Sequence, residues 1–173
     1  MSNVLEKIIN QKKIDLSESK KKYTISQLNA LIRENKSFIN FKQKILDNTI
    51  KNKISVIAEI KKASPSAGII INEYNPIEIA NEYYMNGATC LSILTEQKFF
   101  YGKLEHIKEV KDEIKLPVLC KDFFIDTFQI PLVKSFGADA ILIILSILDK
   151  NLAEEIYQCA NEYNMSTIVE VHT

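Results

Sequence analysis

The fold is decided by residues 116–144, which read LPVLCKDFFIDTFQIPLVKSFGADAILII. A short apolar run, Val118–Cys120, is followed by a segment of helical character that stops at Gly137 and then by a second apolar run, Ala140–Ile144. Strands that are apolar on both faces and separated by helices indicate a parallel sheet covered by helices. This stretch therefore predicts an α/β fold.

The same alternation extends over most of the chain. The predicted strands are Val56–Ile60, Cys90–Leu94, Val118–Cys120, Ala140–Ile144 and Thr167–Val171. The predicted helices are Pro76–Asn86, Leu104–Glu113, a segment from Asp126 or Thr127 to Gly137, and Lys150–Tyr163. Asn75 is the expected N-cap of the first of these helices, and Pro131 is expected to delay or kink the third. An open doubly wound sheet and part of an eight-stranded barrel both fit, and periodicity alone does not separate them.

The first 50 residues have a different character, because no strand pattern appears before Ser55. Three helical segments are expected there, at Val4–Lys21, Ser26–Glu34 and Ser37–Asp47, with Ser26 and Ser37 as N-caps. We therefore divide the chain into a helical extension, residues 1–50, and an α/β part, residues 51–173.

Composition excludes several classes of protein. The 173 residues contain 22 Lys plus Arg and 22 Asp plus Glu, so the chain lacks the broad positive field of a dedicated nucleic-acid binder. Arg33 is the only arginine, so an anion site must use lysine or backbone N–H groups. Cys90, Cys120 and Cys159 stand in apolar runs and predict neither a disulfide framework nor a metal site. The most apolar stretch, Ala140–Leu148, is too short to span a bilayer, and we expect a cytoplasmic protein that binds no membrane.

Charged residues interrupt three of the predicted strands near their carboxyl ends. Glu59 and Lys61 stand two residues apart and so share one face of their strand, while Lys121 and Glu170 close two other strands. In parallel α/β folds this end of the sheet is where ligands bind. Each residue also has a plain interpretation, as a structural ion pair or a solvated strand end. Recurrence on three strands favours a shared site, because a charge in an apolar strand costs several kcal/mol unless it is paired.

Two loops on the same side of the sheet have residues that suit a ligand. The loop Ala63–Gly68 is built of small residues and a glycine, which let backbone N–H groups approach a phosphate. Aromatic residues follow the next two strands, at Phe99–Tyr101 and at Phe123–Phe124, and suit a planar apolar ligand. An ordinary surface loop and core packing are the alternative interpretations.

Five blocks of sequence, in order, resemble the indole-3-glycerol phosphate synthase family. They are residues 56–66 (VIAEIKKASPS), 91–102 (LSILTEQKFFYG), 117–123 (PVLCKDF), 137–143 (GADAILI) and 169–172 (VEVH). The helical first 50 residues are similar to the family's N-terminal extension, which packs over the mouth of the barrel. The resemblance implies a (β/α)₈ TIM barrel, of which this chain supplies strands 1–5 and helices 1–4.

The resemblance also implies a reaction in tryptophan biosynthesis that needs no cofactor. A lyase of this family closes the ring of 1-(2-carboxyphenylamino)-1-deoxyribulose 5-phosphate to indole-3-glycerol phosphate and releases carbon dioxide and water. By matched position Lys121 is the general acid on the ketone, Glu170 and Lys61 transfer protons during dehydration, and Glu59 is a carboxylate partner and proton acceptor. Phe100, Phe123 and Leu142 wall the anthranilate ring, and Ser64 contributes to the phosphate side.

The sequence ends just after the fifth predicted strand, whereas a barrel of this type needs about 200–250 residues. We therefore expect residues 1–173 alone to be inactive, and expect the open sheet edges to allow self-association. One alternative is a non-catalytic half-barrel that binds a phosphorylated ligand or a partner chain. Another is an unrelated open sheet with its first strand inside, which a strand order of 1-2-3-4-5 would exclude.

Overall fold

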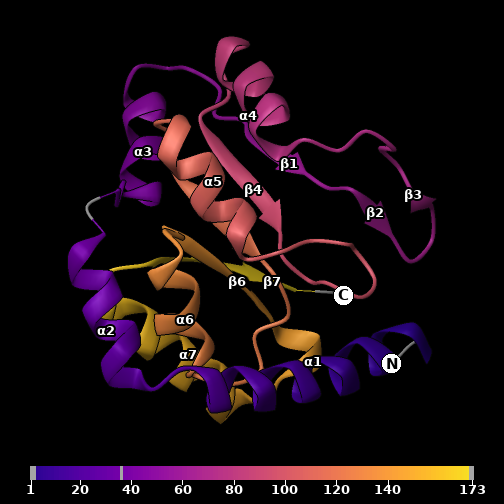
Figure 1. Ribbon diagram of the computed structural model, residues 1–173. Helices are drawn as coiled ribbons and strands as arrows, with labels where there is room; N and C mark the ends of the chain where they lie inside the picture. Colours follow the sequence, from indigo (N-terminus) through magenta and orange to yellow (C-terminus); the bar gives the residue numbers. More distant parts are fainter. Residues whose placement is uncertain (1–2, 36, 172–173) are drawn as a thin grey trace.

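The computed structural model describes residues 3–35 and 37–171 (Figure 1). Its main sheet has five parallel strands in the order β1-β4-β5-β6-β7, which is their order along the chain. The bounds are β1 Ile57–Ile60, β4 Cys90–Leu94, β5 Val118–Lys121, β6 Ala140–Ile144 and β7 Ser166–Glu170. This order confirms the barrel type of sheet and excludes a sheet with the first strand inside. His172, the last residue of the fifth sequence block, and Thr173 lie outside the described residues.

Four helices cover the outer face of this sheet, and the main core lies between them and the strands. They are α4 Pro76–Met85, α5 Glu105–Glu113, α6 Gln129–Ser135 and α7 Lys150–Glu162. Alternate strand residues such as Leu91, Ile93 and Ile141 point into this core. Helix α6 begins two to three residues later than the sequence pattern suggested. Pro131 lies in its first turn, where a missing N–H is tolerated, so the expected delay is confirmed.

The N-terminal part forms three helices, α1 Asn3–Lys22, α2 Ile25–Glu34 and α3 Phe41–Ile50. The predicted N-caps Ser26 and Ser37 are wrong. Thr24 caps α2 through a reciprocal capping box with Gln27, and Asn40 caps α3 by accepting the backbone N–H of Gln43. In each case the cap is the extended residue directly before the helix, and the true helix start lies beside a polar side chain that the apolar pattern did not single out.

The N-terminal helices reach both ends of the sheet. Helix α1 runs past the loops that follow the strands, where Lys20 pairs with Asp126 at 2.6 Å, and lies along the lower edge of Figure 1. Helix α3 lies at the opposite end, because buried Phe41 packs on Cys90 and Ala140, the first residues of β4 and β6. Packing over the mouth thus holds for α1, whereas α3 closes the amino end.

Two short elements were not predicted. The segment after β1 forms a hairpin of β2, Ala63–Ser64, and β3, Gly68–Ile69, which stands out at the right of Figure 1. The chain after β6 makes one 3₁₀ turn, Leu145–Ile147. Within the described residues β1 and β7 are the outer strands of the main sheet, and each exposes apolar side chains, among them Ile57 and Val169. None of the described helices is long and apolar enough to cross a membrane.

Candidate active site

The four charged residues singled out in the strands lie on the inner face of the sheet. Their neighbours Ile60 and Cys120 are completely buried on the outer face, so the alternation of a strand turns Glu59, Lys61 and Lys121 inward. The parallel register places Lys121 beside Leu94 and Glu170 beside Ile144. All four line one cavity of about 220 Å³ at the carboxyl ends of the strands. The structure therefore brings the predicted charged residues together.

Glu59 joins the two lysines of this cavity. One carboxylate oxygen, Oε2, accepts a hydrogen bond from Lys121 Nζ at 2.6 Å, and the other, Oε1, accepts one from Lys61 Nζ. Partial burial opposes ionisation of Glu59, but the hydrogen bonds and charges of the two lysines outweigh it and hold the pKa of Glu59 below its usual range. This carboxylate therefore stays charged near neutral pH and fixes both ammonium groups toward the cavity.

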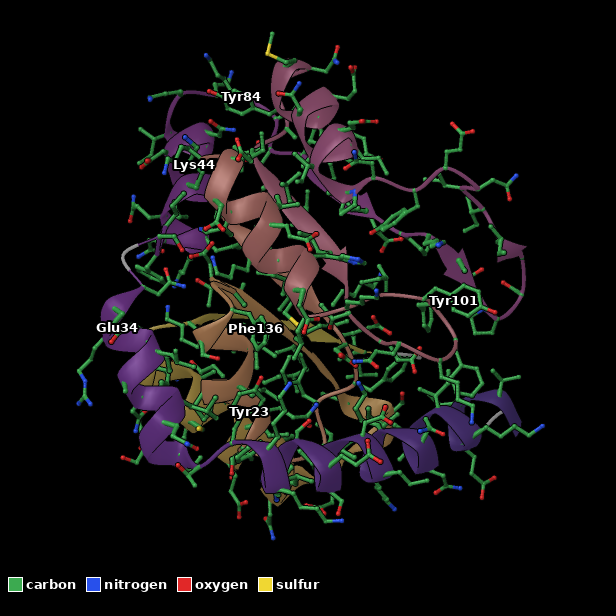
Figure 2. All side chains as sticks on the ribbon, in the orientation of Figure 1. Tyr23, Glu34, Lys44, Tyr84, Tyr101 and Phe136 are labelled. Atoms are coloured by element: carbon green, nitrogen blue, oxygen red, sulfur yellow. The ribbon has the colours of Figure 1, made fainter. Side chains whose placement is uncertain are left out.

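Apolar side chains and one further carboxylate residue, Asp122, form the rest of the cavity. The rings of Phe100 and Phe123 face each other with centroids 6.2 Å apart and planes tilted by 42°. Leu94, Leu142 and Ile144 complete this lining. Tyr101, the residue after Phe100, lies on the loop between β4 and α5 (Figure 2), and its side chain is exposed. The two rings together form an apolar wall against which a flat apolar group can pack, next to the two ammonium groups and the carboxylates of Glu59 and Glu170.

Ser64 stands apart from this cavity. It lies on the β2–β3 hairpin, where its hydroxyl accepts the backbone N–H of Ala67 at 3.2 Å and lies 3.4 Å from the hydroxyl of Ser66. The backbone N–H groups of Ile70 and of Ile71 both donate to the carbonyl of Lys62, which joins the two ends of the hairpin. The Ala63–Gly68 loop is thus a tight turn with internal hydrogen bonds. A phosphate contact of Ser64 stays a prediction.

Sequence reasoning missed a buried polar cluster directly behind the aromatic pair. It consists of Lys12, Thr95, Glu96 and Asp122, which we call the wall cluster. Glu96 and Asp122 stand inside quoted sequence blocks but received no role there. Lys12 stands within the predicted helix Val4–Lys21, and only the folded contact with Asp122 shows that its charge is buried. Among residues 3–35 and 37–171, no group of three or more His, Cys, Asp and Glu side chains is placed to hold a metal ion.

Comparison with known proteins gives consistent matches over the length of the chain. Residues 5–173 match the family model described as indole-3-glycerol phosphate synthase. The chain is 40% identical over 173 residues to a protein of that name from Zymomonas mobilis, covering 100% of the chain and 66% of the relative. It is 38% identical over 169 residues to one from Aliarcobacter butzleri, covering 98% and 64%. The chain thus spans about two thirds of the length of the curated relatives it matches.

Proposed function

This chain belongs to the indole-3-glycerol phosphate synthase family, and we propose that it supplies the catalytic groups for the family's ring closure. The substrate would be 1-(2-carboxyphenylamino)-1-deoxyribulose 5-phosphate, and the products indole-3-glycerol phosphate, carbon dioxide and water. The observation that carries the proposal is the juxtaposition of Lys121, Glu59, Lys61 and Glu170 with a pair of facing aromatic rings in one cavity. This set matches a reaction that joins a flat ring to a carbonyl and then moves protons.

The first step needs an acid more than a base. An aromatic ring carbon is a weak nucleophile, so the ketone that it attacks must be made more electrophilic. In the proposal the Lys121 ammonium, held by Glu59 at 2.6 Å, donates a proton to the ketone oxygen as the new C–C bond forms. The bond to the carboxylate then breaks, carbon dioxide leaves, and its electron pair restores the aromatic ring.

Dehydration needs an acid and a base at the same cavity. In the proposal the Lys61 ammonium donates a proton to the departing hydroxyl, which leaves as water, and the Glu170 carboxylate takes up a proton from the five-membered ring. Each lysine has then lost one proton and Glu170 has gained one. In the proposal Glu59, which contacts Lys61 as well as Lys121, accepts the proton of Glu170 and one proton from solvent in turn and passes them on, which returns both lysines to their ammonium form. The proton from solvent balances the carboxylate that leaves as carbon dioxide. These steps use side chains of the described residues and call for no cofactor.

The apolar side chains would bind the anthranilate part of the substrate. Phe100, Phe123 and Leu142 present apolar surface to the cavity, and excluding water there strengthens the charge interactions of the neighbouring lysines. Ser64, on the β2–β3 hairpin next to this cavity's Lys61 along the chain, is proposed to contribute to the phosphate side of the substrate. We also infer a cytoplasmic location, because Cys90 and Cys120 are buried free thiols.

The apolar flanks of the sheet suggest a second property of residues 1–173. Ile57 on β1 and Val169 on β7 are exposed, and no strand among the described residues covers the outer edges of these two strands. In the proposal these edges pair either with further strands of the same protein or with a second copy of the chain.

The proposal is tested by supplying the part of the barrel that the matched region does not cover. Residues 1–173 are fused to the part of the Zymomonas mobilis relative that the match does not cover, which is about one third of that protein. Formation of indole-3-glycerol phosphate is then followed by its fluorescence. The fused protein is expected to turn over the substrate, and residues 1–173 alone are expected not to. A fused protein that folds and binds the substrate but forms no product would favour the non-catalytic half-barrel instead.

A further inference from the structure

Two buried carboxylates bond to the backbone of the aromatic pair, and one of them, Asp122, also belongs to the lining of the cavity. Glu96 follows β4 and is 0% exposed, and its oxygens accept the backbone N–H groups of Lys98, Phe99 and Phe100 at 3.1, 2.7 and 3.0 Å. Asp122 follows Lys121 and is 6% exposed, and it accepts the N–H of Phe123 at 2.7 Å. Each carboxylate therefore holds the backbone of one of the two facing aromatic residues.

The two carboxylates belong to one connected cluster. Thr95, the residue before Glu96, donates its hydroxyl to Asp122 Oδ2 at 2.7 Å, which ties the end of β4 to the end of β5. The loop after Glu96 is closed at its far end as well, because Gly102 donates its N–H to the Glu96 carbonyl at 2.8 Å. A Cβ at Gly102 would lie 2.2 Å from the Leu94 carbonyl oxygen, so the closure requires glycine.

Lys12 of helix α1 provides the compensating positive charge. Its Nζ lies 2.7 Å from Asp122 Oδ1, and the residue is only 8% exposed. Burial works against this ammonium, but Asp122 and, more weakly, the charge of Glu96 outweigh burial and raise the pKa of Lys12 above its usual range. The Lys12 ammonium thus pairs directly with Asp122 and acts on Glu96 through its charge alone, and removing it would leave negative charge uncompensated in a buried position.

We propose that Glu96 and Asp122 are positioning residues that fix Phe100 and Phe123 for the substrate's ring, with Lys12 as their shared counter-ion. This inference rests on the proposed function for the identity of the ring that packs on Phe100 and Phe123. Asp122 also stands between the general acid Lys121 and Phe123 in the chain, so a shift of the Asp122 backbone would move both of these residues. A displacement near 1 Å at a reacting group can cost about 10²-fold in rate.

The kinetic test uses the fused protein and a matched control on the same helix. Lys12→Met removes the buried cation, whereas Lys20→Met removes the exposed pair of Lys20 with Asp126, whose side chains are 45% and 31% exposed. Lys12→Met is expected to lower kcat/KM by about 10²-fold through both a higher KM and a lower kcat, with Lys12→Arg restoring a large part of it. Lys20→Met is expected to stay within about twofold of the parent.

A second measurement reports on the positions of Phe100 and Phe123 without relying on turnover. The chain has eight phenylalanines, and incorporation of 4-fluorophenylalanine gives each a ¹⁹F signal that single Phe→Leu variants assign. In Lys12→Met, and in Glu96→Gln, which keeps an acceptor oxygen but not the charge, the Phe100 and Phe123 signals are expected to shift or broaden. The signal of Phe41, at the other end of the sheet, is expected to stay in place.

The two readouts separate the two proposals. An inactive parent whose Lys12→Met and Glu96→Gln variants show the ¹⁹F changes would refute the synthase function and leave the positioning role standing. An active parent whose Lys12→Met and Glu96→Gln variants keep its kcat, KM and ¹⁹F spectrum would overturn the positioning role and leave the synthase function standing. If Lys12→Met does not fold, Glu96→Gln alone decides.

Discussion

Replacing Asp139 by asparagine should strongly destabilise the fold, because this buried carboxylate ties three parts of the chain together. It lies just before β6 and is 0% exposed, and its Oδ2 accepts Lys111 Nζ at 2.6 Å and the Val118 N–H at 2.8 Å. Its Oδ1 accepts the N–H of Ile39 at 2.8 Å, on the connection between α2 and α3. One side chain thus links the N-terminal helices to α5 and to the start of β5.

The size of the effect follows from how deeply both charges are buried. Burial raises the pKa of Asp139 and lowers that of Lys111, so for each group desolvation exceeds the attraction of its partner. In Asp139→Asn the Lys111 ammonium, 3% exposed, would lose its counter-ion, and breaking such a pair costs about 3–5 kcal/mol. Replacing both charges removes the desolvation cost as well, so Asp139→Asn combined with Lys111→Met should lose much less stability than Asp139→Asn alone.

Urea unfolding of residues 1–173, followed by circular dichroism, measures these differences. Asparagine keeps only one carbonyl oxygen, so one of the two backbone N–H groups, of Ile39 or Val118, loses its acceptor in the single and in the double variant. The difference between the two variants therefore reports the cost of the unpaired Lys111 charge. Lys108→Met, which removes an exposed pair with Asp112, serves as the control and should change the free energy of unfolding by less than about 1 kcal/mol. A cost of less than about 1 kcal/mol for Asp139→Asn, or a double variant as unstable as the single one, would contradict a structural role for this buried ion pair.

Two further predictions concern titration and thiol chemistry. Because the pKa of Glu59 is lowered in the folded state, its contribution to stability is present above the usual glutamate pKa of about 4.3 and is lost as the pH falls below that value. The free energies of unfolding of the parent and of Glu59→Gln should therefore differ at pH 7 and converge in acid. A difference that does not change with pH would contradict this. Iodoacetamide at pH 8 should modify half-buried Cys159 before Cys90 and Cys120, since burial raises the pKa of Cys90 to about 12 and leaves Cys120 inaccessible. Peptide mass spectrometry gives the order of labelling. Labelling of Cys120 before Cys159 would show that the core opens.

Much of the fold could be predicted because its signals are local. Short apolar runs bounded by turn residues placed all five strands of the main sheet to within one residue, and Asn75 with Pro76 marked the start of α4. The inward set Glu59, Lys61 and Lys121 followed from the two-residue repeat of a strand, which is a property of the backbone itself. The resemblance to a family then supplied the barrel geometry that periodicity left open.

The rest depends on contacts between residues that are far apart along the chain. Lys12 was indistinguishable from the other lysines of its helix, because its burial arises only where α1 meets the end of β5. The hairpin that holds Ser64 is stabilised by bonds from Ile70 and Ile71 to Lys62, and a run of small residues also fits an open phosphate loop. The role of Phe41 at the amino end of the sheet similarly follows from packing on three strands at once.

The most direct test of the central claim is a single-turnover measurement on the fused protein with Lys121→Ala. Removing the acid that polarises the ketone should slow ring closure by about 10²–10⁴-fold, and substrate binding through Phe100 and Phe123 should persist. Release of carbon dioxide should slow by the same factor, because decarboxylation follows formation of the C–C bond. Turnover near that of the parent with purified Lys121→Ala protein would contradict the account and move the acid role elsewhere, first to Lys61.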